Sequence, residues 1–303
     1  MPARFAALDL GSNSFRLQIA KMHNQRLVLE KRIREPVRLA AFLDENKNLR
    51  LAGFYQAAKA LANFHQKLKN FENNHVLATG TFALRSAQNK PEFLPLLEDA
   101  LGFPIRVLSG EEEARYIFYG MQATLPKTNE ARLFIDIGGG STEIICGAGN
   151  QILTLASIPI GCVTQSLLFF KKNTITKEEF AFAQQSAAEM FAPLFKKIVG
   201  LPWKIAFGSS GSVRATMEFL KLNDFSKKRE ITKEILEAIV GEFLKTGDFS
   251  RFKMGDIRAD RRAIMPAGFS ILLALFNTFH IQKLRYAKGA LCQGLLSEMA
   301  GLT

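Results

Sequence analysis

The sequence predicts an α/β fold built from two related domains, and three observations carry this prediction. A strand-like stretch, a glycine turn and a second strand-like stretch occur twice, in "LDLGSNSFRLQIA" (8–20) and in "IDIGGGSTEIICG" (135–147). Strand and helix patterns follow each copy in a similar order. A polar segment with a proline, at 121–132, separates the two halves. The chain has 303 residues, enough for two domains, which we place at 1–124 and 125–303.

In the first half, apolar residues alternate with polar or small ones after the glycine turn, so we expect a strand on each side of it. Phe15, Leu17 and Ile19 are the apolar members of this alternation, which has a period of two. Further patterns predict the elements that follow. The predicted elements are strands at 5–10, 15–19, 26–40, 75–78 and 105–108, and helices at 51–71, at 92–101 and from 109–113 onward.

The second half restarts the order of strand, glycine turn, strand and third strand. We expect strands at 133–137, 143–146, 152–158 and 204–207, and helices at 163–170, 177–199, 212–220, 233–245, 267–280 and 289–299. The C-terminal helix, within about 289–303, is in a position to pack back on the first domain. We expect the two domains to face each other across an interdomain cleft, where two related turns would grip two parts of one phosphorylated ligand.

The composition is that of a soluble globular protein, with 48% hydrophobic and 22% charged residues. The net charge of +12 favours anionic partners: polyphosphate, nucleotides, nucleic acid or an anionic membrane surface. Three cysteines without a CxxC pair argue against a disulfide framework or a zinc site and suit a reducing compartment. The sequence shows no signal peptide and no apolar run long enough to cross a bilayer, so we expect a cytoplasmic protein.

The repeated turn has the chemistry of an anion site. Small residues let an anion approach backbone N–H groups, and such N–H concavities bind phosphate. The Asp before each turn, Asp9 or Asp136, supplies a hard oxygen that suits Mg²⁺, directly or through water. The alternative is that Gly, Ser and Asn are simply good hairpin residues and that each Asp bonds its own turn. Neither copy completes the G-x-G-x-x-G of a dinucleotide site, and no Walker pattern is present.

Six motifs occur in order along nearly the whole chain. They are "DLGSNSFRL" (9–17), "TGTFALRSAQN" (79–89), "SGEEEARYIFYG" (109–120), "DIGGGSTEI" (136–144), "GCVTQSLLFF" (161–170) and "FGSSGSVRA" (207–215). This series resembles the exopolyphosphatase / guanosine pentaphosphate phosphohydrolase (Ppx/GppA) family of the acetate kinase/sugar kinase/Hsp70/actin superfamily. The resemblance implies two ribonuclease-H-like (actin-like ATPase) domains and Mg²⁺-dependent hydrolysis of a terminal phosphoanhydride. The chain looks like the short form of the family, without additional C-terminal helical domains.

Two positions depart from the family pattern. Gly80 and Thr81 stand where the family usually has Ala-Thr. Near the C-terminus the common Gly-Ala-Leu-Arg-Glu-Gly reads "GALCQG" (289–294), so Cys292 and Gln293 replace an Arg–Glu pair. Any role that the family gives to that pair is therefore in doubt for this chain.

The resemblance assigns the water-activating carboxylate to Glu113, the last residue of "EEE". Hydrolysis of a phosphoanhydride needs a group that orients or deprotonates the attacking water. The alternative is helix capping, which we accept for the neighbouring Glu112, because Ser109 and Glu112 have the spacing of a capping box. The motif around Glu113 favours the catalytic role for that residue.

The metal is assigned to the two carboxylates that flank the second turn, Asp136 and Glu143, with Asp9 as the pseudo-symmetric partner. A solvent-facing strand residue is the alternative for Glu143. Phosphate binding is expected from the three small-residue loops and two arginines, whose guanidinium groups pair well with phosphate oxygens. These residues are Gly11, Ser12, Asn13, Ser14, Arg16, Arg85, Gly138, Gly139, Gly140, Ser141, Gly208, Ser209, Ser210, Gly211 and Ser212. Each arginine is alternatively a surface salt-bridge residue.

Several functions remain open from the sequence. The leading one is an exopolyphosphatase that releases orthophosphate from chain ends, and the second removes the 5′-terminal phosphate of guanosine pentaphosphate. Phosphoryl transfer to a nucleoside diphosphate and a non-catalytic sensor of an alarmone or polyphosphate are further alternatives. A kinase is disfavoured because "SGEEEAR" fits no kinase pattern, and a nucleic-acid module because no aromatic motif interleaves the basic runs. We expect no membrane partner, and the oligomeric state stays open, a homodimer included.

Basic clusters at 196–197, 227–229 and 258–262 lie outside these motifs. Such clusters are usually solvated helix faces. With a net charge of +12, a track for a long polyanion is the other interpretation.

Overall fold

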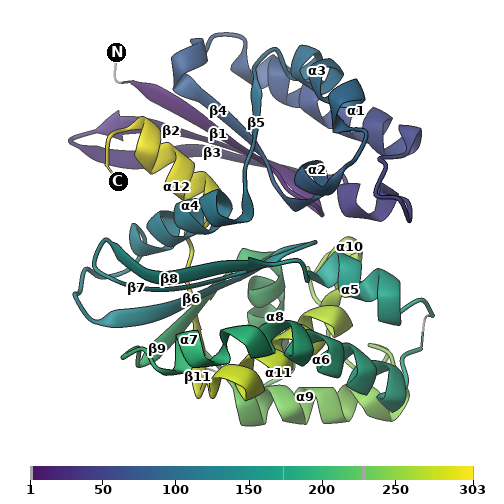
Figure 1. Ribbon diagram of the computed structural model, residues 1–303. Helices are drawn as coiled ribbons and strands as arrows, with labels where there is room; N and C mark the ends of the chain where they lie inside the picture. Colours follow the sequence, from purple (N-terminus) through teal and green to yellow (C-terminus); the bar gives the residue numbers. More distant parts are fainter. Residues whose placement is uncertain (1–2, 173, 227–229, 303) are drawn as a thin grey trace. The chain divides into compact units, whose positions relative to one another are not determined.

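The computed structural model describes residues 3–172, 174–226 and 230–302. The chain divides into two compact units, each with its own sheet (Figure 1). Unit 1 comprises Met1–Thr124 together with Gly289–Thr303, and unit 2 comprises Leu125–Lys288. Among the described residues, no helix combines the length and the apolar character that crossing a bilayer requires.

The sheet of unit 1 has five strands in the order β3-β2-β1-β4-β5. They are β1 (Arg4–Leu10), β2 (Ser14–His23), β3 (Arg26–Pro36), β4 (Val76–Gly80) and β5 (Ile105–Val107). The first three strands form an antiparallel meander, and β4 and β5 run parallel to β1. This order is that of a ribonuclease-H-like sheet, with β1 at the centre and buried along nearly all its length.

Helices cover the sheet of unit 1. They are η1 (Leu39–Phe42), α1 (Leu51–Leu68), η2 (Asn73–His75), α2 (Phe82–Ser86), α3 (Lys90–Leu101), α4 (Gly110–Gln122) and α12 (Leu291–Met299). The C-terminal helix α12 lies alongside α4 and over β1 (Figure 1). The two helices touch backbone to backbone: a Cβ on Gly294 would lie 2.0 Å from the carbonyl oxygen of Tyr116, and one on Gly120 would lie 2.1 Å from that of Ala290. Glycine is therefore required at both positions.

The sheet of unit 2 repeats this order and adds one strand, giving β10-β11-β9-β6-β7-β8. The strands are β6 (Ala131–Ile137), β7 (Thr142–Ala148), β8 (Gln151–Ile158), β9 (Ile205–Ser209), β10 (Glu230–Thr232) and β11 (Lys283–Tyr286). The meander β6-β7-β8 corresponds to β1-β2-β3, and the parallel strands β9 and β11 correspond to β4 and β5. The two units therefore share one strand topology.

The helices of unit 2 surround one central apolar helix. They are α5 (Cys162–Phe169), α6 (Lys177–Phe191), η3 (Ala192–Leu194), α7 (Phe195–Val199), α8 (Ser210–Leu222), α9 (Lys233–Thr246), α10 (Ala259–Arg262) and α11 (Met265–Phe279). Helix α11 is buried along almost its whole length and packs against α5, α6, α8 and α9. Its apolar run is thus explained by burial on all sides.

The structure departs from the predicted elements in two ways. The helix expected at 177–199 is interrupted, because Pro193 lies in the 3₁₀ turn between α6 and α7 and has no N–H to continue the helical pattern. Strands β10 and β11 and helices α2 and α10 were not predicted, because three to five residues are too few to show a period. The other predicted strands and helices are present, with shifted ends.

Candidate active site

In unit 1, three loops meet at the carboxyl ends of the parallel strands. The loop at 11–13 follows β1, Thr81 follows β4, and Ser109 begins the helix after β5. Leu10 pairs with Gly80, and the amide of Leu108 donates to the carbonyl oxygen of Gly80 at 2.9 Å. The carboxyl edge of such a sheet is where α/β proteins place their ligands.

The first glycine loop is anchored through its carbonyl groups. Arg38 N donates to the oxygen of Asn13, and Ala40 N donates to that of Ser12, both at 3.0 Å. A Cβ on Gly11 would lie 3.1 Å from both Asp9 Oδ1 and the Ser14 carbonyl oxygen, so the turn has little room for a larger residue.

The side chain of Asn13 is the unusual feature of this loop. The residue is 5% exposed, and neither atom of its amide has a hydrogen-bond partner among the described residues. A buried amide without partners is costly, and native proteins rarely keep one. This amide therefore favours a polar ligand at the first loop, as the sequence predicts.

A row of polar side chains crosses the sheet beside this loop. Asp9 on β1 pairs with Arg16 on β2 and with Thr79 on β4, so the three side chains share one face. Arg16 Nη1 lies 3.6 Å from Asp9 Oδ2. In unit 1 the aspartate before the turn is thus matched by a cation on the neighbouring strand.

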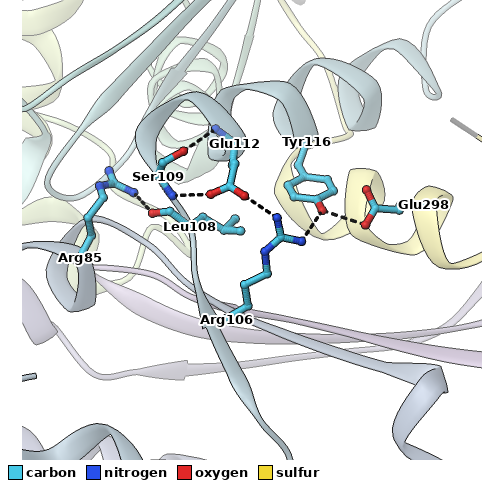
Figure 2. Close-up of polar contacts among 7 residues, drawn as sticks. All are labelled: Arg85, Arg106, Leu108, Ser109, Glu112, Tyr116 and Glu298. Atoms are coloured by element: carbon cyan, nitrogen blue, oxygen red, sulfur yellow. Dashed lines mark hydrogen bonds and ion pairs between the residues drawn. The ribbon is translucent and has the colours of Figure 1, made fainter. Parts of the chain in front are cut away.

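Glu113 lies in the first turn of α4 and is 7% exposed. The cap of this helix is made by its neighbours: Ser109 Oγ accepts from Glu112 N at 3.1 Å, and Glu112 Oε2 accepts from Ser109 N at 2.8 Å (Figure 2). Glu113 is not part of that box. Its Oε2 accepts a hydrogen bond from Arg85 Nη1 at 3.0 Å. Arg85, predicted to bind phosphate, therefore also orients the predicted catalytic carboxylate.

The second glycine loop, in unit 2, is tied to the helix that follows β8. Cys162 N donates to the carbonyl oxygen of Gly138 at 3.0 Å, and Val163 N donates to that of Gly139 at 2.8 Å. A Cβ on Gly161 would lie 2.4 Å from Gly140 N, so the start of α5 touches the loop directly. The loop carbonyls are thereby turned toward α5. The amide hydrogens of Gly139 and Gly140 form no hydrogen bond within the described part of the chain, as an anion-binding turn requires.

Two carboxylates lie side by side next to the second loop. Asp136 on β6 pairs directly with Glu143 on β7, so both side chains lie on one face. Asp136 is 7% exposed and Glu143 is 1% exposed. Ser209 Oγ donates to Asp136 Oδ2 at 2.8 Å, and Ser157 Oγ donates to Glu143 Oε1 at 2.7 Å. Hydroxyl donors on both sides hold the carboxylates in place.

This donor set fits Mg²⁺ better than a transition metal. The described residues contain no group of three His, Cys, Asp or Glu side chains arranged to hold an ion, which is the arrangement that zinc sites use. Magnesium usually keeps several waters and takes one or two protein carboxylates together with phosphate oxygens. Asp136 and Glu143 form a carboxylate pair of the kind that such an ion uses.

The third loop begins α8 and adjoins the second. Ser210 has a φ of 80°, which is a strained conformation for a residue other than glycine. The thiol of Cys162 donates to the Gly138 carbonyl at 3.1 Å and accepts from Ser212 Oγ at 3.2 Å, so it links the two loops. Backbone strain of this kind is common at ligand-binding loops.

One arginine near the third loop was missed by the sequence reasoning. A Cβ on Gly211 would lie 2.3 Å from Arg261 Nη2, so this guanidinium covers the first turn of α8. A helix N-terminus favours an anion, and a cation placed there strengthens that preference. The sequence shows Arg261 only as part of the cluster 258–262, without a signal that α10 meets α8. The cluster 227–229 lies outside the described residues.

Of the two residues that replace the family's Arg–Glu pair, Gln293 ties the C-terminal helix to β2. Gln293 Oε1 accepts from Ala290 N at 3.0 Å, and its Nε2 donates to Gln18 Oε1 on β2. Cys292 is buried, and burial, with a smaller contribution from the charge of Asp9, raises the pKa of its thiol well above the usual range. The thiol is therefore neutral and inert at physiological pH.

The predicted residues thus form one group in each unit. Unit 1 holds the first glycine loop, Arg16, Arg85 and Glu113, while unit 2 holds the second and third loops with the carboxylate pair. Two sheets of ribonuclease-H-like order, each with a glycine turn after its first strand, define the class of proteins with the actin-like fold.

The chain belongs to the Ppx/GppA phosphatase family, whose model matches residues 18–302. A protein of Haemophilus influenzae named "Putative exopolyphosphatase" is 35% identical over 294 residues, which are 97% of this chain and 90% of that protein.

Solved structures agree with the fold. An exopolyphosphatase from Cytophaga hutchinsonii superposes with a TM-score of 0.89, covers 99% of both chains and is 22% identical, which shows the fold alone. A Ppx/GppA family member from Aquifex aeolicus gives a TM-score of 0.77 at 26% identity, with 99% of both chains covered.

Proposed function

We propose that this protein is an exopolyphosphatase, which hydrolyses the terminal phosphoanhydride of inorganic polyphosphate and releases orthophosphate. The observation that carries the proposal is the likeness, over nearly the whole chain, to the Haemophilus influenzae protein with that name. Two features support it: the net charge of +12 suits a polyanionic substrate, and each unit has a glycine turn after its first strand, a feature suited to phosphate.

In this reaction a water molecule attacks the terminal phosphorus. A new P–O bond forms, the bridging P–O bond breaks, and its electron pair stays on the oxygen of the shortened chain. We assign Glu113 as the group that accepts the proton of the attacking water. Arg85 supports this role because its Nη1 binds both Glu113 Oε2, at 3.0 Å, and the Leu108 carbonyl, at 2.9 Å, and so fixes the carboxylate against the start of α4.

The other residues neutralise and position the phosphates. Backbone amides of the two glycine loops and the guanidinium of Arg16 bind phosphoryl oxygens in this proposal. Asp136 and Glu143 would hold Mg²⁺ in this proposal, whereas Asp9 has Arg16, not a second carboxylate, as its ion-pair partner. When bound, Mg²⁺ offsets the negative charge that develops on the phosphoryl oxygens.

A second candidate is hydrolysis of the 5′-terminal phosphate of guanosine pentaphosphate, by the same residues. The third loop favours it, because Arg261 and the N-terminus of α8 offer an anion site beyond the two glycine turns. This substrate carries phosphates on both its 5′ and 3′ oxygens and would use an additional anion site. The family model, which covers both kinds of phosphatase, is compatible with either.

One assay tests the proposal. Purified protein with Mg²⁺ is given long polyphosphate, short polyphosphate and guanosine pentaphosphate side by side, and orthophosphate release is measured. We expect turnover of polyphosphate and a loss of about 10²–10⁴-fold in Glu113→Gln, the usual size for a lost general base. Glu111→Gln, an exposed neighbour in the same helical turn, is the matched control and should leave the rate unchanged.

Three results would contradict the proposal. An unchanged rate in Glu113→Gln would remove that residue from its role, and preference for guanosine pentaphosphate would favour the second candidate. Binding of either compound without turnover would leave only a sensor.

We also infer that the protein works in the cytoplasm. All three cysteines are free and buried in the structure, which suits a reducing compartment.

A further inference from the structure

Four side chains link the C-terminal helix to the first turn of α4 (Figure 2). Glu298 on α12 accepts a hydrogen bond from Tyr116 Oη at 2.8 Å. Tyr116 Oη accepts in turn from Arg106 Nη1 at 3.3 Å, and Arg106 Nη2 forms a short ion pair with Glu112 Oε1. We call these residues, Glu298, Tyr116, Arg106 and Glu112, the α12–α4 network.

The network fixes the start of α4 because its last member is also the helix cap. Glu112 accepts hydrogen bonds from Ser109 N and, with a smaller effect, from Arg106, and these contacts lower the pKa of its carboxyl. Arg106 meanwhile spans one full turn of the helix, from Glu112 to Tyr116. Rotation of the first turn would break several of these bonds at once.

Arg106 donates in both directions along the network, to the Glu112 carboxylate and to the phenol oxygen of Tyr116. The phenol donates onward to the Glu298 carboxylate, so the cation lies between two anions. Burial, with the nearby Glu298, raises the pKa of Tyr116 to about 12, so the phenol keeps its proton over the physiological range. Bonds to charged groups are the stronger kind.

The position of Glu298 depends on the close packing of the two helices. Gly294 touches the backbone of Tyr116, and Glu298 lies four residues later, on the same face of α12. The backbone contact and the side-chain hydrogen bond therefore meet at one residue of α4.

Glu113 follows Glu112 directly and is held from the other side by Arg85, which also binds the carbonyl of Leu108. Two sets of hydrogen bonds thus hold the first turn of α4. Arg85 on α2 binds Glu113, and the α12–α4 network binds Glu112.

We propose that Glu298, Tyr116 and Arg106 are positioning residues for Glu113, which makes the C-terminal helix part of the catalytic apparatus. This inference rests on the proposed function of Glu113. The residues act through the helix cap and touch neither substrate nor water. A loosened first turn would let the Glu113 carboxylate move away from the attacking water. Misplacement of a catalytic group by about 1 Å lowers the rate of the chemical step, and here it would leave substrate binding largely unchanged.

The test compares Tyr116→Phe with Tyr119→Phe, which makes the same change on the same helix but outside the network. We expect kcat on long polyphosphate to fall about tenfold in Tyr116→Phe, with KM within about twofold of wild type, whereas Tyr119→Phe keeps the wild-type kcat. Glu298→Gln retains an oxygen that accepts from Tyr116, so it should keep most of the activity that Glu298→Ala loses. Circular dichroism and thermal melting confirm that each variant is folded.

A double-mutant cycle with Glu113→Gln separates positioning from general stability. If the network acts through Glu113, adding Tyr116→Phe to Glu113→Gln leaves the residual rate unchanged, because nothing remains to be positioned. An additive tenfold loss in that background, or an unchanged kcat in the single variant, would overturn the inference. If wild type turns over no phosphoanhydride, the proposed function fails instead, and that result is distinct from either of these.

Discussion

The two units share one strand topology but differ in the residue that faces the aspartate beside each glycine turn. In unit 1 the aspartate before the turn, Asp9, pairs across the strands with Arg16. In unit 2 the equivalent aspartate, Asp136, pairs with Glu143. The next strand supplies a hydroxyl in both cases, Thr79 or Ser209. Arg16 and Glu143 thus occupy equivalent positions in the two sheets. With Arg16 the charge of the aspartate in unit 1 is neutralised, whereas with Glu143 unit 2 has two carboxylates that attract cations.

This difference indicates that the two units, although they share one strand topology, suit different ligands. Arg16 Nη1 lies 3.6 Å from Asp9 Oδ2, so the row in unit 1 contains a guanidinium, a group that pairs well with phosphate oxygens. Asp136 and Glu143 are both buried and lie side by side, and a bound cation would offset the repulsion between two such carboxylates. The carboxylate pair therefore suits a metal ion, and the unit 1 row suits an anion.

The largest expected effect is the loss of the carboxylate pair. Asp136→Asn and Glu143→Gln each keep shape and remove one negative charge, so we expect the rate on polyphosphate to fall at least about 100-fold. The rate should recover partly as Mg²⁺ is raised, because the site is weakened rather than destroyed. Orthophosphate release over a series of Mg²⁺ concentrations measures both effects. Rates within about threefold of wild type would contradict the assignment.

The two loops should also differ in how much added volume they tolerate. In Gly161→Ala the new Cβ would lie 2.4 Å from Gly140 N, and in Gly11→Ala it would lie 3.1 Å from Asp9 Oδ1. We expect Gly161→Ala to cost about 1–3 kcal/mol of unfolding free energy, the range of overpacking, and Gly11→Ala to cost less. Thermal melting of both variants checks this order. The reverse order would mean that the first loop, not the second, is the more rigidly attached.

Substitutions of Asp9 and Arg16 in unit 1 should reduce the rate less than loss of the carboxylate pair does, and their effects should be coupled. Asp9→Asn and Arg16→Gln are each expected to change the rate several-fold, chiefly through KM for polyphosphate. The double variant should lose less than the product of the two single losses, because the residues lie within ion-pair distance and share one interaction. Fully additive losses would show that Asp9 and Arg16 act independently.

The smallest expected effect is on stability at alkaline pH, and it arises from Tyr116 in unit 1. The folded pKa of Tyr116, about 12, is above the unfolded value near 10, so its stabilising contribution is complete below pH 10 and declines as the pH rises toward 12. Tyr116→Phe lacks this titration, so its melting temperature should fall less over that interval than that of wild type. Parallel slopes for the two proteins would show that Tyr116 titrates normally.

The sequence predicts most of the fold because its signals are local. The alternation after Gly11 and the apolar stretches on both sides of the second glycine turn mark the strands, and the capping box at Ser109 marks the start of α4. The prediction fails where a short element depends on distant contacts. Strand β11, for example, is only four residues long and is stabilised by pairing with β9 and β10.

The site is predictable to the extent that its residues stand in motifs. The spacing of Asp136 and Glu143 already places them across a hairpin, and the structure shows them as direct cross-strand partners. The contacts of Arg261 with Gly211 and of Glu298 with Tyr116 join segments far apart in the sequence, and each depends on a close backbone approach at a glycine or on helix packing. No local pattern reveals such contacts.

Direct binding of a divalent cation tests the central claim, that the carboxylate pair of unit 2 and not the row of unit 1 holds the metal. Mn²⁺, a paramagnetic substitute for Mg²⁺, is titrated into wild type, Glu143→Gln and Asp9→Asn without phosphate, and free ion is followed by electron paramagnetic resonance. We predict that Glu143→Gln raises the Kd for Mn²⁺ at least about tenfold, as expected when one of two carboxylate ligands is lost, while Asp9→Asn binds as wild type does. Equal Kd values for wild type and Glu143→Gln, or a loss of binding confined to Asp9→Asn, would contradict the account.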